Sequence, residues 1–477
     1  MPGFLRKKMT ATCKKEFNSV KSAHLIGIKG TAMEALAELF VSRGINVTGS
    51  DVSDTFYTDA LLRDLGIVPS EGFSSDNIPE GVDLIVHSTA YNKDNNPEVA
   101  YAVEKNLPLI SYPEALGLLF GETTGIAICG THGKTTTTAM LAEILKKEGL
   151  DPAALVGSKV SGWGKSTLSG QGNYFIAEAD EYQNKLQHYK PHGVVVTNID
   201  YDHPDFFASS EAYVSVFHDF FQKIPAEGFL VFNIDDPEAK KAARGASCKT
   251  ISFGEGNADF SLQSRSVTSL GQVFHFTVAG EGSFECMLQL SGSHNAANAL
   301  AAIAAAFELG VPVESAARYL AEFASSERRF QAMGKTANGA LIFDDYAHHP
   351  EEIKATLKGA RERFPEKKII VAFHPHTYSR TEALFEEFSQ AFGLADMVYI
   401  LDIYASAREN AESAKVHSRD LAERIMANGV DAEYVPTIEQ LAPVVAEEIN
   451  QTSVFISMGA GDVWKIHEML LKNKAKK

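Results

Sequence analysis

The chain has 477 residues, which is too many for a single hydrophobic core, so we expect three domains of ordinary size. Hydrophobic residues make up 45% and charged residues 22%, which is typical of a folded globular protein and excludes a largely disordered chain. The formal net charge of -17 argues against general nucleic-acid binding, because no basic stripe offsets the repulsion of a polyanion. The basic runs Arg6 to Lys15 and Lys472 to Lys477 are interpreted as solvated chain ends.

The spacing of the cysteines and the hydropathy of the chain predict the cellular location of the protein. Cys13, Cys129, Cys248 and Cys286 lie far apart and form no CxxC pair, so the sequence predicts neither a zinc site nor a disulfide framework. No apolar stretch of signal-peptide length follows the N-terminus, and no run of about 18 apolar residues occurs. We therefore expect a soluble cytoplasmic protein with no membrane partner.

The first predicted domain spans residues 1–121. An apolar strand beginning at His24, a glycine turn, an apolar-periodic helix over Met33–Ser42 and a strand ending at Asp51 form a βαβ unit. Apolar strands at Val82–His87 and Leu109–Tyr112 continue the alternation. This pattern predicts a parallel sheet with helices on its faces.

Two further α/β patterns follow. From Gly125 a strand, a glycine turn and a helix begin the second predicted domain, residues 122–327, which ends after an alanine-rich helix over Asn295–Leu309. Strands and helices alternate again in the third, residues 328–477. No repeat of solenoid period is present. The fold class predicted from this order is α/β throughout.

The densest chemistry lies at the start of the second domain. A glycine-rich segment separates an apolar strand from a helix: Gly130, Thr131, His132, Gly133, Lys134 and Thr135. Glycines let backbone N–H groups face phosphate, Lys134 neutralises charge, and Thr135 supplies a hydroxyl for Mg²⁺. The usual first glycine is replaced by Ile128, which leaves a structural turn as the alternative. The strand-to-helix placement favours nucleotide binding.

Acidic groups follow the next two predicted strands. Glu178-Ala179-Asp180-Glu181 comes after one strand and Asp200-Tyr201-Asp202-His203 after the next. Because the carboxyl ends of parallel strands converge on one crevice, these groups are candidates for holding Mg²⁺ beside the phosphate loop. Solvated loop charge is the alternative interpretation.

Taken together, five segments resemble the Mur ligases over nearly the whole chain: GTHGKTTT, EADE, TNIDYDH, HNAANALAA and DDYAHHP, in that order. The resemblance implies a Rossmann-like N-terminal domain for UDP-N-acetylmuramate, a central P-loop domain for ATP, and a Rossmann-like C-terminal domain for the amino acid. It also implies a role in peptidoglycan synthesis, which builds the bacterial cell wall.

Within the central and C-terminal motifs, the resemblance implies that Lys134 binds the terminal phosphates and that Thr135, Glu178 and His203 hold Mg²⁺. The implied ATP-binding residues are Gly130, Thr131, His132, Gly133, Lys134, Thr135, Asn295, Asn298, Arg329 and Asp345. Without the resemblance, each of these residues has an alternative role. Asn295 and Asn298 could cap the alanine-rich helix, and Arg329 could be a charge on the surface.

The implied reaction passes through an acyl phosphate. ATP phosphorylates the muramyl carboxylate, and the amine of the amino acid then attacks it to give amide, ADP and phosphate. The implied catalytic residues are Lys134, Glu178, His203, His348 and Arg329, while His132, Glu178, His348 and His349 are candidates for removing the amine proton. Since ATP-binding candidates lie in two domains, we expect the domains to close.

The amino-acid acceptor site carries its own signals. Family members that add later amino acids usually have a lysine about fourteen residues past the histidine that ends the TNIDYDH segment, His203 in this chain. Here that position is Phe217. By resemblance to the family branch that has an aromatic residue here, this implies unsubstituted UDP-N-acetylmuramate as substrate. The segment from His376 to Arg380 resembles family members that add L-alanine, which implies L-alanine as the amino acid. A recycled murein tripeptide is the alternative, which Tyr182 favours, and Thr377 stands where arginine is usual.

In the N-terminal domain, Gly27-Ile28-Lys29-Gly30-Thr31-Ala32 follows a strand and Asp51 lies where a ribose-binding acid would. An oxidoreductase would need three glycines there, so we favour UDP-sugar binding at the helix N-terminus, with Lys29 facing the diphosphate. The implied substrate-binding residues are Gly27, Gly30, Thr31, Met33, Asp51, Ser88, Thr89, His132, Tyr346, His376 and Arg380.

Overall fold

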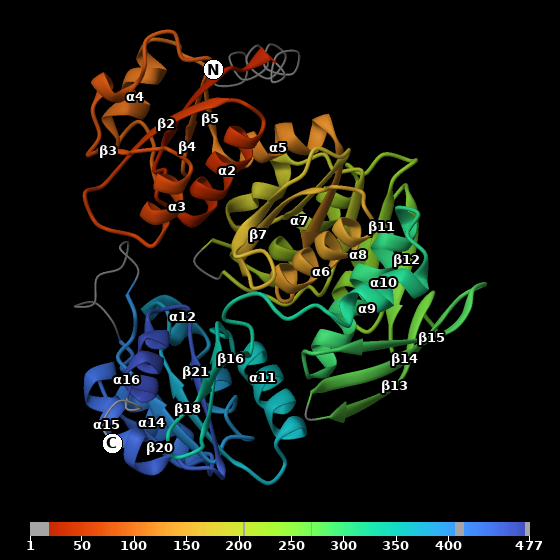
Figure 1. The fold of residues 1–477 in the computed structure, drawn as a ribbon, viewed down its shortest axis with the longest axis vertical. Helices are drawn as coiled ribbons and strands as arrows, with labels where there is room; N and C mark the ends of the chain where they lie inside the picture. Colours follow the sequence, from red (N-terminus) through yellow and green to blue (C-terminus); the bar gives the residue numbers. More distant parts are fainter. Residues whose placement is uncertain (1–18, 204–205, 269, 406–414, 473–477) are drawn as a thin grey trace.

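A computed structural model describes residues 19–203, 206–268, 270–405 and 415–472, and shows three α/β units arranged around a common centre (Figure 1). Each unit has its own sheet. The predictions about Cys13, the basic run from Arg6 to Lys15 and residues 473–477 lie outside these ranges. Among the described helices, none is both long and apolar enough to cross a bilayer.

The N-terminal unit is a parallel five-stranded sheet in the order β3-β2-β1-β4-β5. Its strands are β1 (Ser22–Ile26), β2 (Asn46–Asp51), β3 (Ser70–Glu71), β4 (Leu84–His87) and β5 (Leu109–Ser111), and its helices are α2 (Thr31–Ser42), α3 (Thr58–Asp64), α4 (Pro97–Glu104) and α5 (Tyr112–Glu122). The chain runs outward from β1 to β3 and then returns to β4 on the other side of β1. The loop after β1 therefore lies at a topological switch point, where α/β sheets bind ligands.

The central unit is a ten-stranded sheet in the order β15-β14-β13-β12-β11-β10-β6-β9-β7-β8. Its strands are β6 (Thr124–Cys129), β7 (Ala153–Val160), β8 (Lys165–Ser169), β9 (Tyr174–Glu178), β10 (Gly193–Val196), β11 (Phe229–Asn233), β12 (Lys249–Gly254), β13 (Phe260–Thr268), β14 (Gly271–Val278) and β15 (Gly282–Leu288). Its helices are α6 (Lys134–Lys147), α7 (Ser210–Phe221), α8 (Pro237–Ala243), α9 (Ser293–Glu308) and α10 (Val313–Leu320).

Strand β6 lies in the middle of this sheet and is buried on both faces. Its Ile126 and Ile128 pack with the cluster that includes α6 and α9, whereas Ala127 and Cys129 pack with the cluster that includes α7. This two-sided burial explains why the strand is almost continuously apolar in sequence. The end of β6 is consequently a rigid base for the glycine-rich loop.

The C-terminal unit is a six-stranded sheet in the order β16-β17-β21-β18-β19-β20, in which only the β16–β17 pair is antiparallel. Its strands are β16 (Gln331–Lys335), β17 (Leu341–Asp345), β18 (Lys368–Phe373), β19 (Met397–Ile400), β20 (Ala432–Tyr434) and β21 (Ser453–Met458). Its helices are α11 (Pro350–Arg363), α12 (Tyr378–Ala383), α13 (Phe385–Ser389), α14 (Ser418–Ala427), α15 (Ile438–Glu448) and α16 (Ile466–Lys472).

Specific polar contacts join the units. Glu38 on α2 accepts hydrogen bonds from Lys165, Thr167 and Ser169 on β8, so the N-terminal unit is fastened to the edge of the central sheet. On the other side, Arg265 of β13 forms a two-pronged ion pair with Glu362 of α11, with both N–O distances at 2.8 Å. In Figure 1, α11 is the C-terminal helix that faces the central unit.

We expect the Arg265–Glu362 pair to stabilise the contact between the central and C-terminal units by about 1–2 kcal/mol, because it is bidentate and mostly shielded from water. A double-mutant cycle with Arg265→Ala and Glu362→Ala, followed by urea unfolding, measures this coupling. The matched control is the Arg424–Glu386 pair, which lies within the C-terminal unit and is about half exposed. Equal coupling in the two pairs would contradict the proposed link between units.

Candidate active site

The glycine-rich loop is the sharp turn between β6 and α6, and both of its glycines are required. Gly130 has φ 123°, and a Cβ atom there would lie 2.3 Å from Thr197 Oγ1. Gly133 has φ 84°, and a Cβ atom there would lie 2.4 Å from Asn298 Oδ1. Ile128, which stands where a standard phosphate loop has glycine, is fully buried within β6. The turn therefore begins only at Gly130 and needs no glycine earlier.

Lys134 is held over this turn as a cation. Its Nζ donates hydrogen bonds to the carbonyl oxygens of Gly130 (2.5 Å) and Thr131 (3.1 Å) and lies 3.3 Å from Glu181 Oε2. Burial opposes the charge, but Glu181 and Asp180 outweigh it and raise the pKa of Lys134. A positive charge is thus fixed where the phosphates of a nucleotide would meet the start of α6.

Oxygen ligands suited to Mg²⁺ lie next to Lys134. Thr135 Oγ1 donates a hydrogen bond to Glu178 Oε2 at 3.1 Å, and the backbone N–H of Gly157 donates to the other carboxylate oxygen. Burial raises the pKa of Glu178, which a bound cation would offset. His203 lies with Asp180 and Glu181 instead, their potential ligand atoms being within 4.8 Å of one another. The structure thus pairs two of the three predicted metal ligands and places the third in an adjacent acidic group.

Arg329 reaches this site from the C-terminal unit. Its Nη2 donates to Thr135 Oγ1 at 3.4 Å, and its guanidinium lies over the ring of Tyr346. Arg328 and Phe330 on either side have φ 58° and 49°, so the turn that aims Arg329 is unusual for non-glycine residues. The alternative of a free surface charge is therefore wrong for Arg329.

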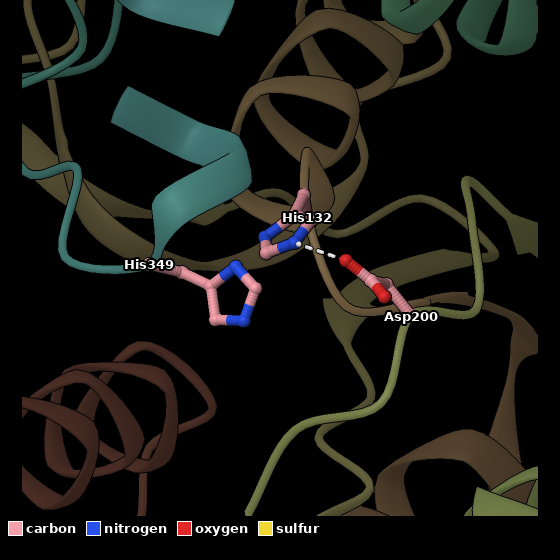
Figure 2. A group of neighbouring side chains, drawn as sticks. All are labelled: His132, Asp200 and His349. Carbon is pink, nitrogen blue, oxygen red and sulfur yellow. Dashed lines mark ion pairs between the residues drawn. The ribbon is translucent and has the colours of Figure 1, made fainter. Parts of the chain in front are cut away.

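His132 is the point of the loop where the two units meet. It lies 3.3 Å from Glu352 Oε1 through Nδ1 and 3.6 Å from Asp200 Oδ2 through Nε2, and it faces His349 of the C-terminal unit (Figure 2). Burial lowers the pKa of His132, but Asp200 and Glu352 outweigh it and raise the pKa to about 9. His132 is consequently an imidazolium at neutral pH.

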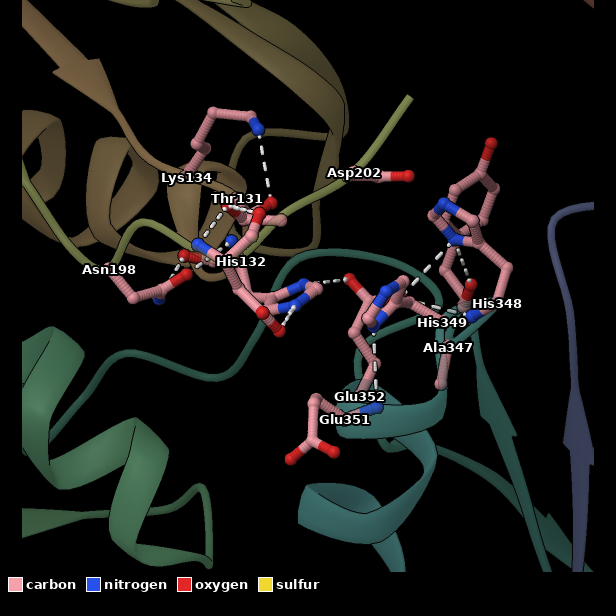
Figure 3. A network of polar contacts seen from close by, with 12 residues as sticks. Thr131, His132, Lys134, Asn198, Asp202, Ala347, His348, His349, Glu351 and Glu352 are labelled. Atoms are coloured by element: carbon pink, nitrogen blue, oxygen red, sulfur yellow. Dashed lines mark hydrogen bonds and ion pairs between the residues drawn. The ribbon is translucent and has the colours of Figure 1, made fainter. Parts of the chain in front are cut away.

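Glu352 on α11 connects this loop to the histidines of the C-terminal unit (Figure 3). It accepts a hydrogen bond from the backbone N–H of His348 at 3.0 Å and also contacts the rings of His348 and His132 and the guanidinium of Arg329. Although burial opposes ionisation, these neighbours hold the pKa of Glu352 well below its usual range. The residue was absent from the sequence prediction, since His348 precedes α11 and the two residues are not neighbours on one helix face.

His348 is neutral in this setting. Burial lowers its pKa to about 4, and its Nδ1 lies 3.1 Å from the carbonyl oxygen of Tyr346 and 3.3 Å from Glu352. An Nδ1–H that donates to these oxygens leaves Nε2 as the basic atom. His348 can therefore accept a proton while Glu352 stabilises the resulting cation.

The two asparagines do not cap α9. Gly292 is the N-cap of this helix, so Asn295 and Asn298 lie inside its first turns and the capping alternative is wrong. Asn295 Nδ2 donates to the carbonyl oxygen of Ser291 at 2.8 Å, and Asn298 lies against Gly133 of the loop.

Asp345 supports the turn that carries Arg329. Its two carboxylate oxygens accept hydrogen bonds from the backbone N–H groups of Phe330 (2.8 Å) and Ala347 (2.7 Å). Burial raises its pKa to about 6. Its predicted contact with ribose stays a prediction.

The residues predicted for the amino acid gather beside His348. The ring of His376 lies 6.3 Å from that of His348, and the ring of Tyr404 stacks on His376. Arg380 belongs to α12, which begins at Tyr378, and its Nη2 lies 3.4 Å from Asp202 Oδ1. This ion pair connects the C-terminal unit with the acidic loop after β10.

Phe217, the residue at the position of the expected lysine, is fully buried in α7, with its ring 5.3 Å from that of Tyr213. An apolar core surrounds this position. A charged group could not be placed there without a large desolvation penalty.

The loop after β1 has the shape of a ligand-binding turn. Gly27 has φ 84°, and a Cβ atom there would lie 2.8 Å from the ring of Tyr91 and 3.0 Å from Ser88. Gly30 is the N-cap of α2, and the hydroxyl of Tyr57 donates to Thr31 Oγ1 at 2.7 Å. These residues open the start of α2 to an anion.

Other predicted residues of this unit have different surroundings. Lys29 Nζ donates to the carbonyl oxygens of Val52 and Asp54, so its predicted orientation toward a diphosphate is wrong in this structure. Asp51 accepts hydrogen bonds from the backbone N–H groups of Lys29 and Val52. Met33 is buried and Thr89 is exposed.

Comparisons with known proteins agree with this geometry. Three family descriptions match in order: "Mur ligase family, catalytic domain" over residues 22–123, "Mur ligase middle domain" over 128–306 and "Mur ligase, glutamate ligase domain" over 328–461. Among solved structures, the UDP-N-acetylmuramate-alanine ligase of Thermotoga maritima is 28% identical with a TM-score of 0.79, covering 95% of this chain and 98% of its own. A murein peptide ligase of Psychrobacter arcticus is 25% identical with a TM-score of 0.71, covering 95% and 98%.

Relatives of similar length are closer in sequence. The UDP-N-acetylmuramate--L-alanine ligase of Desulfitobacterium hafniense is 42% identical over 94% of this chain and 99% of its own length. The ligase of the same name from Clostridium acetobutylicum is 39% identical over 94% and 97%. The chain therefore belongs to the Mur ligase family.

Proposed function

We propose that the protein joins L-alanine to the lactoyl carboxylate of UDP-N-acetylmuramate with hydrolysis of ATP to ADP and phosphate, a step of peptidoglycan synthesis. The observation that carries this proposal is the meeting of two units at the glycine-rich loop: Arg329 contacts Thr135, and Glu352 contacts His132. The full-length relatives that bear this activity in their names support the choice of substrates.

The proposed division of labour follows the three sheets. Residues 1–121 bind the UDP-sugar through Gly27, Gly30, Thr31 and the segment Ser88-Thr89, residues 122–327 bind ATP, and residues 328–477 supply Arg329 and the amino-acid site. The position of the β1 loop at a switch point and of the ATP loop at the end of β6 supports this assignment.

For the first chemical step, Lys134 and Arg329 bind and orient the terminal phosphates, so that two anions can approach each other. Thr135 and Glu178, with His203 close by, are the residues that would hold Mg²⁺, whose chemistry is to neutralise charge on the phosphates. The buried, hydrogen-bonded carboxylate of Glu178 supports this choice of ligand.

For the second step, we assign His348 as the group that takes the proton from the incoming amine. Its imidazole is neutral, and Glu352 lies beside its Nδ1. Arg380 and His376 are assigned to the amino acid, with Arg380 turning from Asp202 to the carboxylate of the substrate.

Phosphate release by the purified protein tests the proposal and its acceptor. With ATP, Mg²⁺ and UDP-N-acetylmuramate, we expect release to depend on L-alanine and to be slower with glycine or L-serine. Release only with the murein tripeptide would select the tripeptide alternative, and no release with any acceptor would refute a ligase.

Two lysines of α6 provide a matched control for that assay. We expect Lys134→Ala to lower kcat/KM by roughly 10²–10³-fold, because a charge on the reacting phosphates is lost. Lys146→Ala, on the exposed side of the same helix, should leave it unchanged.

The raised pKa of His132 predicts a pH dependence of stability. Because the folded-state pKa of about 9 lies above the unfolded value of 6.5, the contribution of His132 is complete below pH 6.5 and is lost as the pH rises through 9. We expect Glu352→Gln to lower the pKa of His132 by about 1 unit, so that this loss begins at a lower pH.

Histidine NMR titration and urea unfolding between pH 6 and 10 measure these two quantities. Glu351→Gln is the control, because Glu351 is an exposed neighbour on the same helix that pairs with Lys354. An unchanged His132 titration in Glu352→Gln would show that Glu352 does not set this charge.

A further inference from the structure

A cluster of three potential metal ligands lies between the central and C-terminal units. Figure 2 shows His132 and Asp200 of the central unit facing His349 of the C-terminal unit, and the nearest ligand atoms of the three lie within 4.8 Å of one another. His132 Nε2 is 3.6 Å from Asp200 Oδ2, which is too long for a hydrogen bond. The cluster is separate from the pair formed by Thr135 and Glu178.

Two ring nitrogens in this cluster have unused polar capacity. The Nε2 atom of His349 is buried, with the residue only 5% exposed, and has no hydrogen-bond partner within the described part of the chain. The Nε2 atom of His132 is also buried without a hydrogen bond, and its one polar neighbour is Asp200 in the 3.6 Å ion pair. A buried polar atom without a partner is unfavourable and rare in folded proteins. A ligand that both nitrogens contact would remove this penalty.

We propose that His132, Asp200 and His349 bind a first-row transition-metal cation, Zn²⁺ being the best fit, and that this cation joins the two units. Two imidazoles and one carboxylate suit Zn²⁺ and leave a fourth position open, whereas Mg²⁺ prefers oxygen ligands throughout. Bond lengths of about 2.0–2.1 Å place tetrahedral ligand atoms about 3.4 Å apart, so the cluster must contract by roughly 1 Å. Contraction is feasible because His349 approaches from a different unit.

The surroundings of the ligands decide the proton positions. His132 Nδ1 lies 3.3 Å from Glu352, so its Nδ1–H donates to this carboxylate, as in many carboxylate–histidine–metal arrangements. Because His132 is an imidazolium before the metal binds, binding at Nε2 releases the Nε2 proton to solvent. His349 Nδ1 now accepts a long hydrogen bond of 3.3 Å from Glu351 N–H. Metal binding at its Nε2 moves the ring proton to Nδ1 and gives up this one contact.

Binding at this place has a consequence for turnover. His132 belongs to the ATP loop and His349 is adjacent to His348, so a bound Zn²⁺ holds the two units together and inhibits the reaction. The metal site itself does not depend on the ligase activity. Only the effect on turnover rests on the proposed function.

Titration with Co²⁺ in excess Mg²⁺ tests the site, because Co²⁺ in a nitrogen-containing tetrahedral site absorbs visible light and Mg²⁺ occupies the oxygen ligands. We expect one Co²⁺ per chain, displaced by Zn²⁺, and at least ten-fold weaker binding in Asp200→Asn and His349→Ala. The Asp200 side chain is 44% exposed, so Asp200→Asn should fold.

His218→Ala is the matched control, since His218 forms an exposed pair with Asp219 far along α7 and should not affect Co²⁺ binding. Lack of a visible band, or equal binding in wild type and both variants, would overturn the proposal. In the phosphate-release assay, Zn²⁺ should inhibit wild type more than Asp200→Asn, each relative to its own activity without Zn²⁺. Co²⁺ binding by a protein without ligase activity would instead refute the proposed function and retain the metal site.

Discussion

The active site depends on one buried carboxylate that contacts two units at once. Glu352 lies in the first turn of α11 in the C-terminal unit, and its Oε1 is 3.3 Å from Nδ1 of His132 in the ATP loop of the central unit. A buried anion is unfavourable unless cations and hydrogen-bond donors surround it. Arg329 and the backbone N–H of His348 provide part of that environment from the same unit, and His132 completes it only when the two units are together.

The same charge balance extends through the central unit. Lys134 is surrounded by the carboxylates that follow β9, and these carboxylates keep it charged despite burial. Burial raises the pKa of Glu178 next to it, although Thr135 and the backbone N–H of Gly157 donate hydrogen bonds to it and Lys134 and Arg329 lie nearby. Lys134 is thus a cation whose charge is already balanced by carboxylates, whereas the buried carboxylate of Glu178 would be stabilised by a further positive charge. This arrangement is expected where a nucleotide and its metal ion bind.

Much of this site could be predicted from local sequence, because strand, turn and helix are encoded by neighbouring residues. The run from Gly125 into α6 was such a case, and the structure shows the turn at Gly130 and Gly133 that the sequence predicted. The ends of the elements were less accurate: β1 was predicted to begin at His24 and begins at Ser22, two residues earlier.

Contacts between distant segments could not be predicted in this way. Neither the link from Glu352 to His132 nor that from Arg380 to Asp202 leaves a trace in spacing, since each joins different units. Lys29 was misassigned because the carbonyl groups that bind it belong to a loop more than twenty residues away. Strands β7, β8 and β11 were not predicted, although only β8 lies at an edge of the sheet.

We infer that the C-terminal unit completes the ATP site, so that it is needed for phosphorylation of the carboxylate as well as for attack by the amine. A single-turnover burst of ADP with ATP, Mg²⁺ and UDP-N-acetylmuramate, in the absence of any amino acid, measures the first chemical step by itself. If Arg329 and Glu352 complete the ATP site, Arg329→Ala and Glu352→Gln will both lose most of this burst. A full burst in both variants, with only amide formation lost, would contradict the claim.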